Sequence, residues 1–118
     1  EGTKFFEFVA NNSNVEWSQI KFGTKSNYVS TAHKPHSEAG GGHLLRELVI
    51  GKYTIREHIH SHPTSTEGPS GYKPHHKKSG DKSFAEWINK YAPKVKLSVY
   101  EKKTGEYIPY NYEKVLEN

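Results

Sequence analysis

The pattern of apolar and polar positions predicts its clearest helix over residues 81–91. Four large apolar residues recur there at the i, i+3, i+4 and i+7 spacing of one helical face: Phe84, Trp87, Ile88 and Tyr91. Residues 94–100 then alternate apolar and polar side chains, which predicts a half-buried strand. Residues 106–112 return after a Lys-Thr-Gly turn, and Pro109 predicts an edge strand because proline donates no backbone hydrogen bond.

The N-terminal part of the chain predicts a short helix followed by a β-hairpin. Residues 3–11 place Phe5, Phe6 and Val9 on one helical side, ahead of an Asn-Asn-Ser-Asn stretch that ends the helix. Residues 15–22 and 27–32 alternate well enough for two strands, and a Gly-Thr-Lys-Ser turn joins them.

The middle of the chain predicts loops around one further strand. Residues 33–42 hold three consecutive glycines and predict a loop, whereas the apolar block at 43–50 fits either a helix or a strand. Residues 53–60 are rich in β-branched and apolar side chains and predict a strand. Residues 64–80 show no period and predict an exposed loop. This order of elements predicts an α+β fold in one domain over residues 1–118, with a mixed, mostly antiparallel sheet flanked by helices.

Composition narrows the chemistry that such a fold can carry. The chain has no cysteine, which excludes disulfides, thiolate metal sites and thiol nucleophiles, so a metal must be held by His, Asp or Glu. No apolar run approaches the length of a transmembrane helix. The formal net charge of +4 comes from lysines that are scattered along the chain, which favours ordinary surface charge over a nucleic-acid interface.

The best candidate for chemistry is the run His60-Ser61-His62-Pro63, at the end of the strand predicted over 53–60. Residues two apart on a strand point to the same face, so the two histidines are expected side by side with the serine facing away. Two imidazoles and one carboxylate form the ligand set of a catalytic zinc site, and Asp81 at the start of the predicted helix is the candidate carboxylate. The competing interpretation is a pair of surface histidines and an ordinary first-turn aspartate.

This ordered set of residues resembles the JAMM motif of the JAB1/MPN metalloprotease family, in which a glutamate precedes His-x-His-Pro and a serine and an aspartate follow. Within this family, the sequence is most similar to the JAB-like toxin domains at the C-terminal ends of bacterial polymorphic toxins. The shared segments are Val15-Glu16-Trp17-Ser18, His-Ser-His-Pro, Pro-Ser-Gly and Gly80-Asp81-Lys82. The resemblance covers approximately Val15 to Tyr100. It implies the JAB/MPN (cytidine-deaminase-like) architecture and an origin in the C-terminal part of a longer protein.

Carried over residue by residue, the resemblance implies Zn²⁺ held by His60, His62 and Asp81, with Glu16 as the general base. Glu7 and Glu47 are rivals of Glu16, but only Glu16 lies on an early strand directly after a helix, as the family requires. The competing interpretation of Glu16 is an outward-facing strand carboxylate.

The serine that stabilises the oxyanion in this family has two candidates here. Ser70 follows Pro63 after six residues, as in bacterial members, but ten residues separate it from Asp81 where the family has two. Ser79 leaves one residue before Asp81. Each serine could instead be a turn residue. The inserted residues 71–80 are expected either to overhang the metal and select the substrate or to form a solvated loop.

The remaining histidines are interpreted as loop residues. His33 and His36 flank a proline, and neither this pair nor His75-His76 has a carboxylate at fixed reach. We therefore expect no second metal site from them.

The resemblance implies a zinc-dependent hydrolase of amide or isopeptide bonds that acts as an effector or toxin. It further implies a protein or peptide substrate, ubiquitin-like conjugates among them, an immunity protein as partner, and delivery into a target cell. The alternative is a catalytically inactive MPN-type binding module, although such members usually lose the histidines that this chain keeps. The sequence contains neither a Gly-x-Ser-x-Gly motif nor a phosphate-binding glycine loop. This argues against a hydrolase with a nucleophilic serine and against a protein that binds phosphate through a glycine-rich loop.

Overall fold

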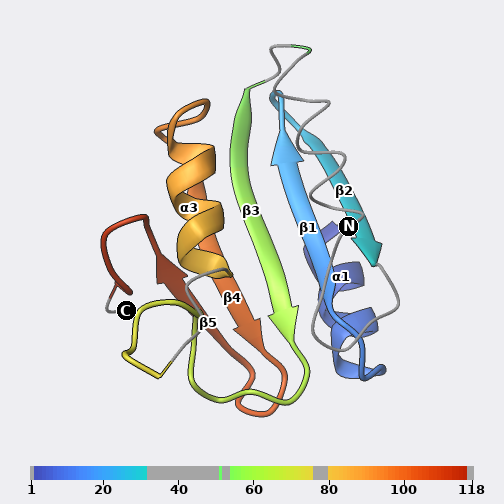
Figure 1. The fold of residues 1–118 in the computed structure, drawn as a ribbon. Helices are drawn as coiled ribbons and strands as arrows, with labels where there is room; N and C mark the ends of the chain where they lie inside the picture. Colours follow the sequence, from blue (N-terminus) through green and yellow to red (C-terminus); the bar gives the residue numbers. More distant parts are fainter. Residues whose placement is uncertain (1, 32–50, 52–53, 76–79, 117–118) are drawn as a thin grey trace.

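The computed structural model describes residues 2–31, 51, 54–75 and 80–116. In this part of the chain, two helices lie on opposite faces of a five-stranded sheet (Figure 1). The helices are α1 (Gly2–Asn11) and α3 (Asp81–Asn89). The strands are β1 (Trp17–Phe22), β2 (Ser26–Thr31), β3 (Ile55–His62), β4 (Lys96–Glu101) and β5 (Glu106–Tyr110). The predicted α+β class is confirmed.

The strands lie in the order β2-β1-β3-β4-β5. β3 and β4 are parallel, as expected for strands whose connection contains a helix, here α3. The other neighbouring strands are antiparallel, so the sheet is mixed and mostly antiparallel, as predicted. Pro109 pairs with Ser98 from the edge strand β5, which confirms its predicted edge position.

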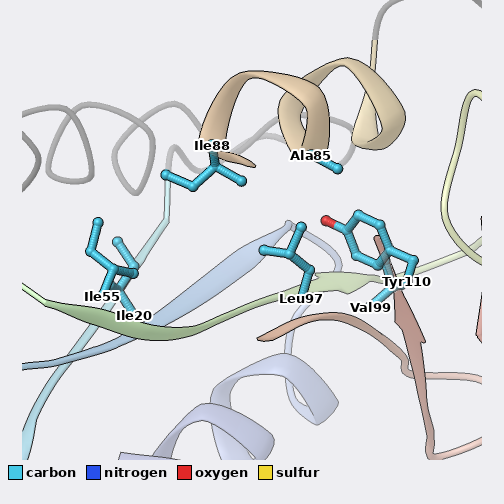
Figure 2. Packing of buried hydrophobic residues seen from close by; sticks show 7 residues of the cluster. All are labelled: Ile20, Ile55, Ala85, Ile88, Leu97, Val99 and Tyr110. Carbon is cyan, nitrogen blue, oxygen red and sulfur yellow. The ribbon is translucent and has the colours of Figure 1, made fainter. Parts of the chain in front are cut away.

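One hydrophobic cluster fills the space between α3 and the sheet (Figure 2). Its buried members are Ile20, Ile55, Ala85, Ile88, Leu97, Val99 and Tyr110. The buried face of α3 runs through Asp81, Ala85 and Ile88, whereas Tyr91 lies beyond the helix end and is 55% exposed. The predicted stripe is confirmed in part: Ile88 is buried, and Phe84 and Trp87 pack against the cluster while partly exposed, but Asp81 and Ala85 occupy buried positions that the stripe did not include.

A second cluster lies between α1 and the opposite face of the sheet: Phe6, Ala10, Ile59 and Tyr100. Because both faces are covered, β4 is buried along almost its whole length, including Ser98. The prediction of a half-buried strand over 94–100 is wrong for this reason: Ser98 faces α1 and not solvent.

A β-bulge in β3 decides which of its residues face α3. The consecutive residues Lys21 and Phe22 of β1 pair with Glu57 and Ile55, so Arg56 is an extra residue on β3. The bulge reverses the alternation of faces. Ile55 consequently packs toward α3, on the same side as the even-numbered residues that follow it.

The boundaries of the elements differ by a few residues from those predicted. β3 continues through His62, so both motif histidines lie within the strand. The expected loop at 33–42 and the apolar block at 43–50 lie outside the described residues. Among the helices that the structure describes, none is long and apolar enough to cross a membrane.

Candidate metal centre

Three histidines form a row on the face of β3 that looks toward α3: His58, His60 and His62. Strand alternation places them there and turns Ser61 to the other face, as predicted. The ring centroids of His60 and His62 are 5.0 Å apart, and their side chains are 8% and 12% exposed. Pro63 follows at once and lies outside the strand.

Asp81 is the first residue of α3, and its carboxylate reaches both of these imidazoles. Oδ1 lies 2.7 Å from Nε2 of His60, and Oδ2 lies 3.4 Å from Nε2 of His62. The structure therefore brings together the three candidate ligands, each of which offers an atom within 4.8 Å of the others. All three residues are buried.

The donor set fits a tetrahedral metal ion. With ligand bonds of about 2.1 Å, the ligand atoms of a tetrahedral zinc ion lie about 3.4 Å apart. The separation between Asp81 and His62 is 3.4 Å and matches that spacing, whereas the 2.7 Å between Asp81 and His60 is shorter than it. Two imidazole nitrogens and one carboxylate oxygen can thus hold a metal ion after small side-chain adjustments.

Burial and charge act in opposite directions on the carboxyl of Asp81. Burial raises its pKa, but the charges and hydrogen bonds of His60 and His62 outweigh burial and hold the pKa of Asp81 well below its usual range. His58 packs instead against Phe84, with ring centroids 4.8 Å apart. Burial, followed by repulsion from His60, lowers the pKa of His58 to about 3. At neutral pH Asp81 is an anion and His58 is uncharged.

Ser70 is clamped to the first turn of α3 despite the ten residues between it and Asp81. Its backbone N–H donates to Oδ2 of Asp81 at 2.7 Å, and its Oγ accepts from the backbone N–H of Asp81 at 3.0 Å. Its carbonyl accepts from the backbone N–H of Lys82 at 3.1 Å. Gly80 makes this approach possible, because a Cβ at its φ of 134° would lie 2.4 Å from Oγ of Ser70.

Glu16 lies on the wall of a cavity of about 290 Å³ that His62, Ser70 and Asp81 also line. The remaining lining residues come mostly from the loop after β3: Pro63, Thr64, Ser65, Glu67, Gly68 and Gly80. Glu16 precedes β1 by one residue and shares the parity of Ser18, which pairs with His60. Its side chain is therefore directed to the same face of the sheet as the histidines.

Glu101 anchors the loop after β3 and was not among the site residues predicted from the sequence. Glu101 pairs with His62 across β3 and β4 and is only 3% exposed. Its Oε2 accepts a hydrogen bond from the backbone N–H of Gly68 at 2.6 Å. The signal in the sequence was a glutamate at the end of a strand that is otherwise buried, because a buried carboxylate needs a hydrogen-bond donor. The loop is consequently less exposed than predicted, and Pro63, Gly68 and Pro69 are buried.

The other candidates do not join the centre. His75 lies in the inserted segment, where its Nε2 is 2.7 Å from Oε1 of the exposed Glu67. Glu7 accepts a hydrogen bond from the hydroxyl of Tyr107 on the α1 face. The rest of the candidates lie outside the described residues: Ser79, Glu47, His33, His36 and His76.

Comparison with known proteins agrees with this geometry. The model of the family described as JAB-like toxin 1 matches residues 1–86, which include Glu16, the candidate metal ligands and Ser70. No curated protein matches the chain. The two helices and the mixed five-stranded sheet of the described residues are consistent with the JAB/MPN fold. Because the match covers 86 of 118 residues, the chain belongs to the JAB-like toxin 1 family and contains a toxin domain of JAB/MPN type.

Proposed function

We propose that this domain is a zinc-dependent hydrolase of amide or isopeptide bonds. The observation that carries the proposal is the convergence of His60, His62 and Asp81, from β3 and α3, on one buried point beside a cavity. A cation bound by these three side chains would compensate for the cost of burying their polar groups. Its position at a cavity gives a substrate access to it.

Zinc is the ion that we propose. Two imidazoles and one carboxylate, with no thiolate in the chain, are a ligand set that Zn²⁺ accepts while keeping a position open. When bound, the ion supplies Lewis acidity, which polarises a carbonyl and lowers the pKa of water to about 7.

Glu16 is the group that we assign to proton transfer. Its carboxylate lies on the cavity wall together with His62 and Asp81. We assign it the proton that the attacking water loses, which it then delivers to the leaving nitrogen of the amide. Asp81 is unsuited to this role, because its two oxygens contact the imidazoles and these hold its pKa well below its usual range, which makes it a weak base.

Ser70 is the group that we assign to the oxyanion. Its Oγ already accepts a hydrogen bond from the backbone N–H of Asp81, which leaves the hydroxyl proton to be donated. A hydroxyl fixed at the cavity wall can donate to the oxygen that becomes negative when the carbonyl is attacked. The clamp on α3 holds that donor in place before the substrate arrives.

Membership of a toxin family supports an action inside a target cell. We propose delivery as part of a longer protein, a protein or peptide substrate such as a ubiquitin-like conjugate, and an immunity protein that blocks the cavity. These three elements rest on the family and not on the geometry of the site.

The test is an assay of the purified domain against di-ubiquitin chains and peptidoglycan-type peptides, with the zinc content measured in parallel. We expect one zinc ion per chain and cleavage of at least one substrate class. His60→Ala is expected to bind no zinc. Glu16→Gln is expected to keep zinc and to lose activity by about 10²- to 10⁴-fold, the usual contribution of a general base.

His75→Ala is the matched histidine control, because His75 contacts Glu67 and not the candidate ligands. It is expected to keep the zinc content of the wild type. Cleavage that survives both His60→Ala and Glu16→Gln would rule out the mechanism. A wild-type domain that binds no zinc and cleaves no substrate would favour an inactive binding module.

A further inference from the structure

The pairing of β1 with β3 ends at Ser18, two residues after Glu16 in the chain. The last pair in this ladder is Ser18 with His60, so the next pair would join Trp17 to Ser61. That backbone pair does not form in the structure. Instead the backbone N–H of Trp17 donates to the side-chain Oγ of Ser61 at 2.9 Å. A side chain thus takes the place of the backbone acceptor at the position where β1 leads into Glu16.

The other polar atom of the same peptide group is also held by a hydroxyl. The carbonyl oxygen of Glu16 accepts a hydrogen bond from Oγ1 of Thr31 on β2 at 2.5 Å. The carbonyl of Glu16 and the N–H of Trp17 belong to one peptide unit, which is planar. Its two ends are therefore held by side chains from the strands on either side of β1, Ser61 on β3 and Thr31 on β2.

This double attachment limits where the Glu16 side chain can go. With the peptide plane held, Cα of Glu16 is held as well, and the side chain can move only through rotation about ψ of Glu16 and its own torsions. Trp17, on the other side of the peptide, is held against the α1 layer, where its Nε1 donates to Oγ of Ser13 at 2.8 Å. Glu16 is therefore directed into the cavity that His62 and Asp81 line.

Burial makes the hydroxyl of Ser61 hard to replace. Ser61 is 1% exposed, so water cannot take over its hydrogen bond to Trp17 if the hydroxyl is removed. Ser61 also lies between His60 and His62 in the chain but on the opposite face of β3. The same residue run thus supplies two candidate ligands to one face and one tether to the other.

We infer that Ser61 and Thr31 are positioning residues that hold Glu16 in place for proton transfer at the metal centre. This inference rests on the proposed function of Glu16. Neither Ser61 nor Thr31 lines the cavity, and their hydroxyls reach the centre through the Glu16–Trp17 peptide.

The test compares Ser61→Ala and Thr31→Val, which remove the hydroxyls, with Thr31→Ser, which keeps one. Removal of either hydroxyl is expected to lower kcat by about tenfold or more, since displacement of a reacting group by about 1 Å costs up to about 100-fold. KM and zinc affinity are expected to stay at the wild-type values, and Thr31→Ser is expected to recover most of the loss. In the Glu16→Gln background, Ser61→Ala is expected to cause no further loss.

Amide hydrogen exchange of Trp17 supplies a readout that requires neither metal nor activity. Loss of one hydrogen bond is expected to speed the exchange of this amide by about tenfold in Ser61→Ala. Ser98→Ala is the matched control, because Ser98 is a buried serine on the same face of the sheet that pairs with Ile59 and not with β1.

Three results would overturn the inference: unchanged exchange of Trp17 in Ser61→Ala, an equal loss of activity in the Glu16→Gln background, or a parallel loss of zinc affinity. An inactive wild-type domain would instead remove the proposed function. Exchange at Trp17 would then still confirm or overturn the tether itself.

Discussion

The two faces of the sheet treat buried polar groups in different ways. On the face covered by α1, polar atoms at the ends of aromatic side chains meet partners. The hydroxyl of Tyr100 donates to Oδ1 of Asn11 at 2.8 Å, and Nε1 of Trp17 donates to Oγ of Ser13 at 2.8 Å. Oε1 of Gln19 is a buried exception. Apart from that atom, the described groups on this face form a closed structural layer.

On the face covered by α3, buried polar atoms remain available. Within the part of the chain that the structure describes, Nδ1 of His58, Nδ1 of His62 and the hydroxyl of Tyr110 have no hydrogen-bond partner. Buried polar atoms without a protein partner are usually explained by ordered water, a bound ion or a chemical role. The α1 layer thus satisfies most of its polar groups within the protein, whereas the α3 layer keeps unpaired polar groups close to the candidate metal centre.

The largest expected difference between the two faces is the effect of removing a candidate ligand from the α3 face. His60→Ala is expected to reduce hydrolysis by about 10⁴-fold, equivalent to about 5 kcal/mol of transition-state stabilisation. It is also expected to abolish the rise in Tm on addition of zinc, because only a site that binds the ion gains stability from it. Kinetics and thermal melts with and without a chelator measure both effects. A zinc-dependent rise in Tm that persists in this variant would place the ion elsewhere.

Substitutions on the α1 face are expected to lower the free energy of unfolding without changing metal binding. Phe6 is fully buried and packs edge-on against Tyr100, with ring centroids 5.9 Å apart. Phe6→Ala is expected to lower the free energy of unfolding by about 3–5 kcal/mol. Phe8→Ala, on the same helix but 65% exposed, is expected to change it by less than about 0.5 kcal/mol. Denaturant titration measures the difference, and a loss of zinc affinity in folded Phe6→Ala would contradict the separation of the faces.

A pair of glycine variants tests the clamp between Ser70 and α3. Gly80→Ala places a Cβ 2.4 Å from Oγ of Ser70, whereas Gly105→Ala meets no atom within 4 Å. Both glycines have positive φ, 134° and 71°, so each variant carries backbone strain of about 1–3 kcal/mol. Only Gly80→Ala is expected also to weaken zinc binding, by about 10- to 100-fold, because it displaces a group that orients a ligand. Equal zinc affinities in the two variants, measured by competition with a chelator, would show that the clamp does not orient Asp81.

The smallest effect concerns pH and His58. Its pKa of about 3 in the folded state is below the value of about 6.5 in the unfolded chain. The uncharged form is therefore favoured by folding, so the contribution is complete above pH 6.5 and is lost as the pH falls toward 3. Between pH 7 and pH 5 the loss is about 2 kcal/mol. In metal-free protein, His58→Phe is expected to flatten the pH dependence of the unfolding free energy by that amount, and an unchanged slope would contradict the assignment.

The common facing of the two motif histidines and the class of the fold could be predicted because both depend on local periodicity. The alternation of β3 was enough to put His60 and His62 on one face, and helical spacing was enough to find α3. The role of Ser98 was not predictable in this way. Its burial depends on α1, which packs on the sheet from the far end of the sequence. The sequence of a strand does not show whether a distant helix covers its second face.

The place of Ser70 could not be read from spacing, because distance along the chain and distance in space differ there. Ten residues separate Ser70 from Asp81, yet their backbone and side-chain atoms are hydrogen-bonded. A fixed motif spacing therefore left two serines open. The signal that could have favoured Ser70 is Gly80, since a glycine directly before a helix aspartate allows another segment to approach closely.

The extra residue at Arg56 divides β3 into two stretches that are out of phase with each other. Without Arg56 the ladder would run regularly from Glu57 to Ile55, so Ile55 would still pair with Phe22 and face the hydrophobic cluster. The candidate ligands would also keep their pairing with β1 and β4. Loss of the extra residue would therefore change neither the packing of Ile55 nor the facing of His60 and His62, because the bulge absorbs one residue of chain length between them.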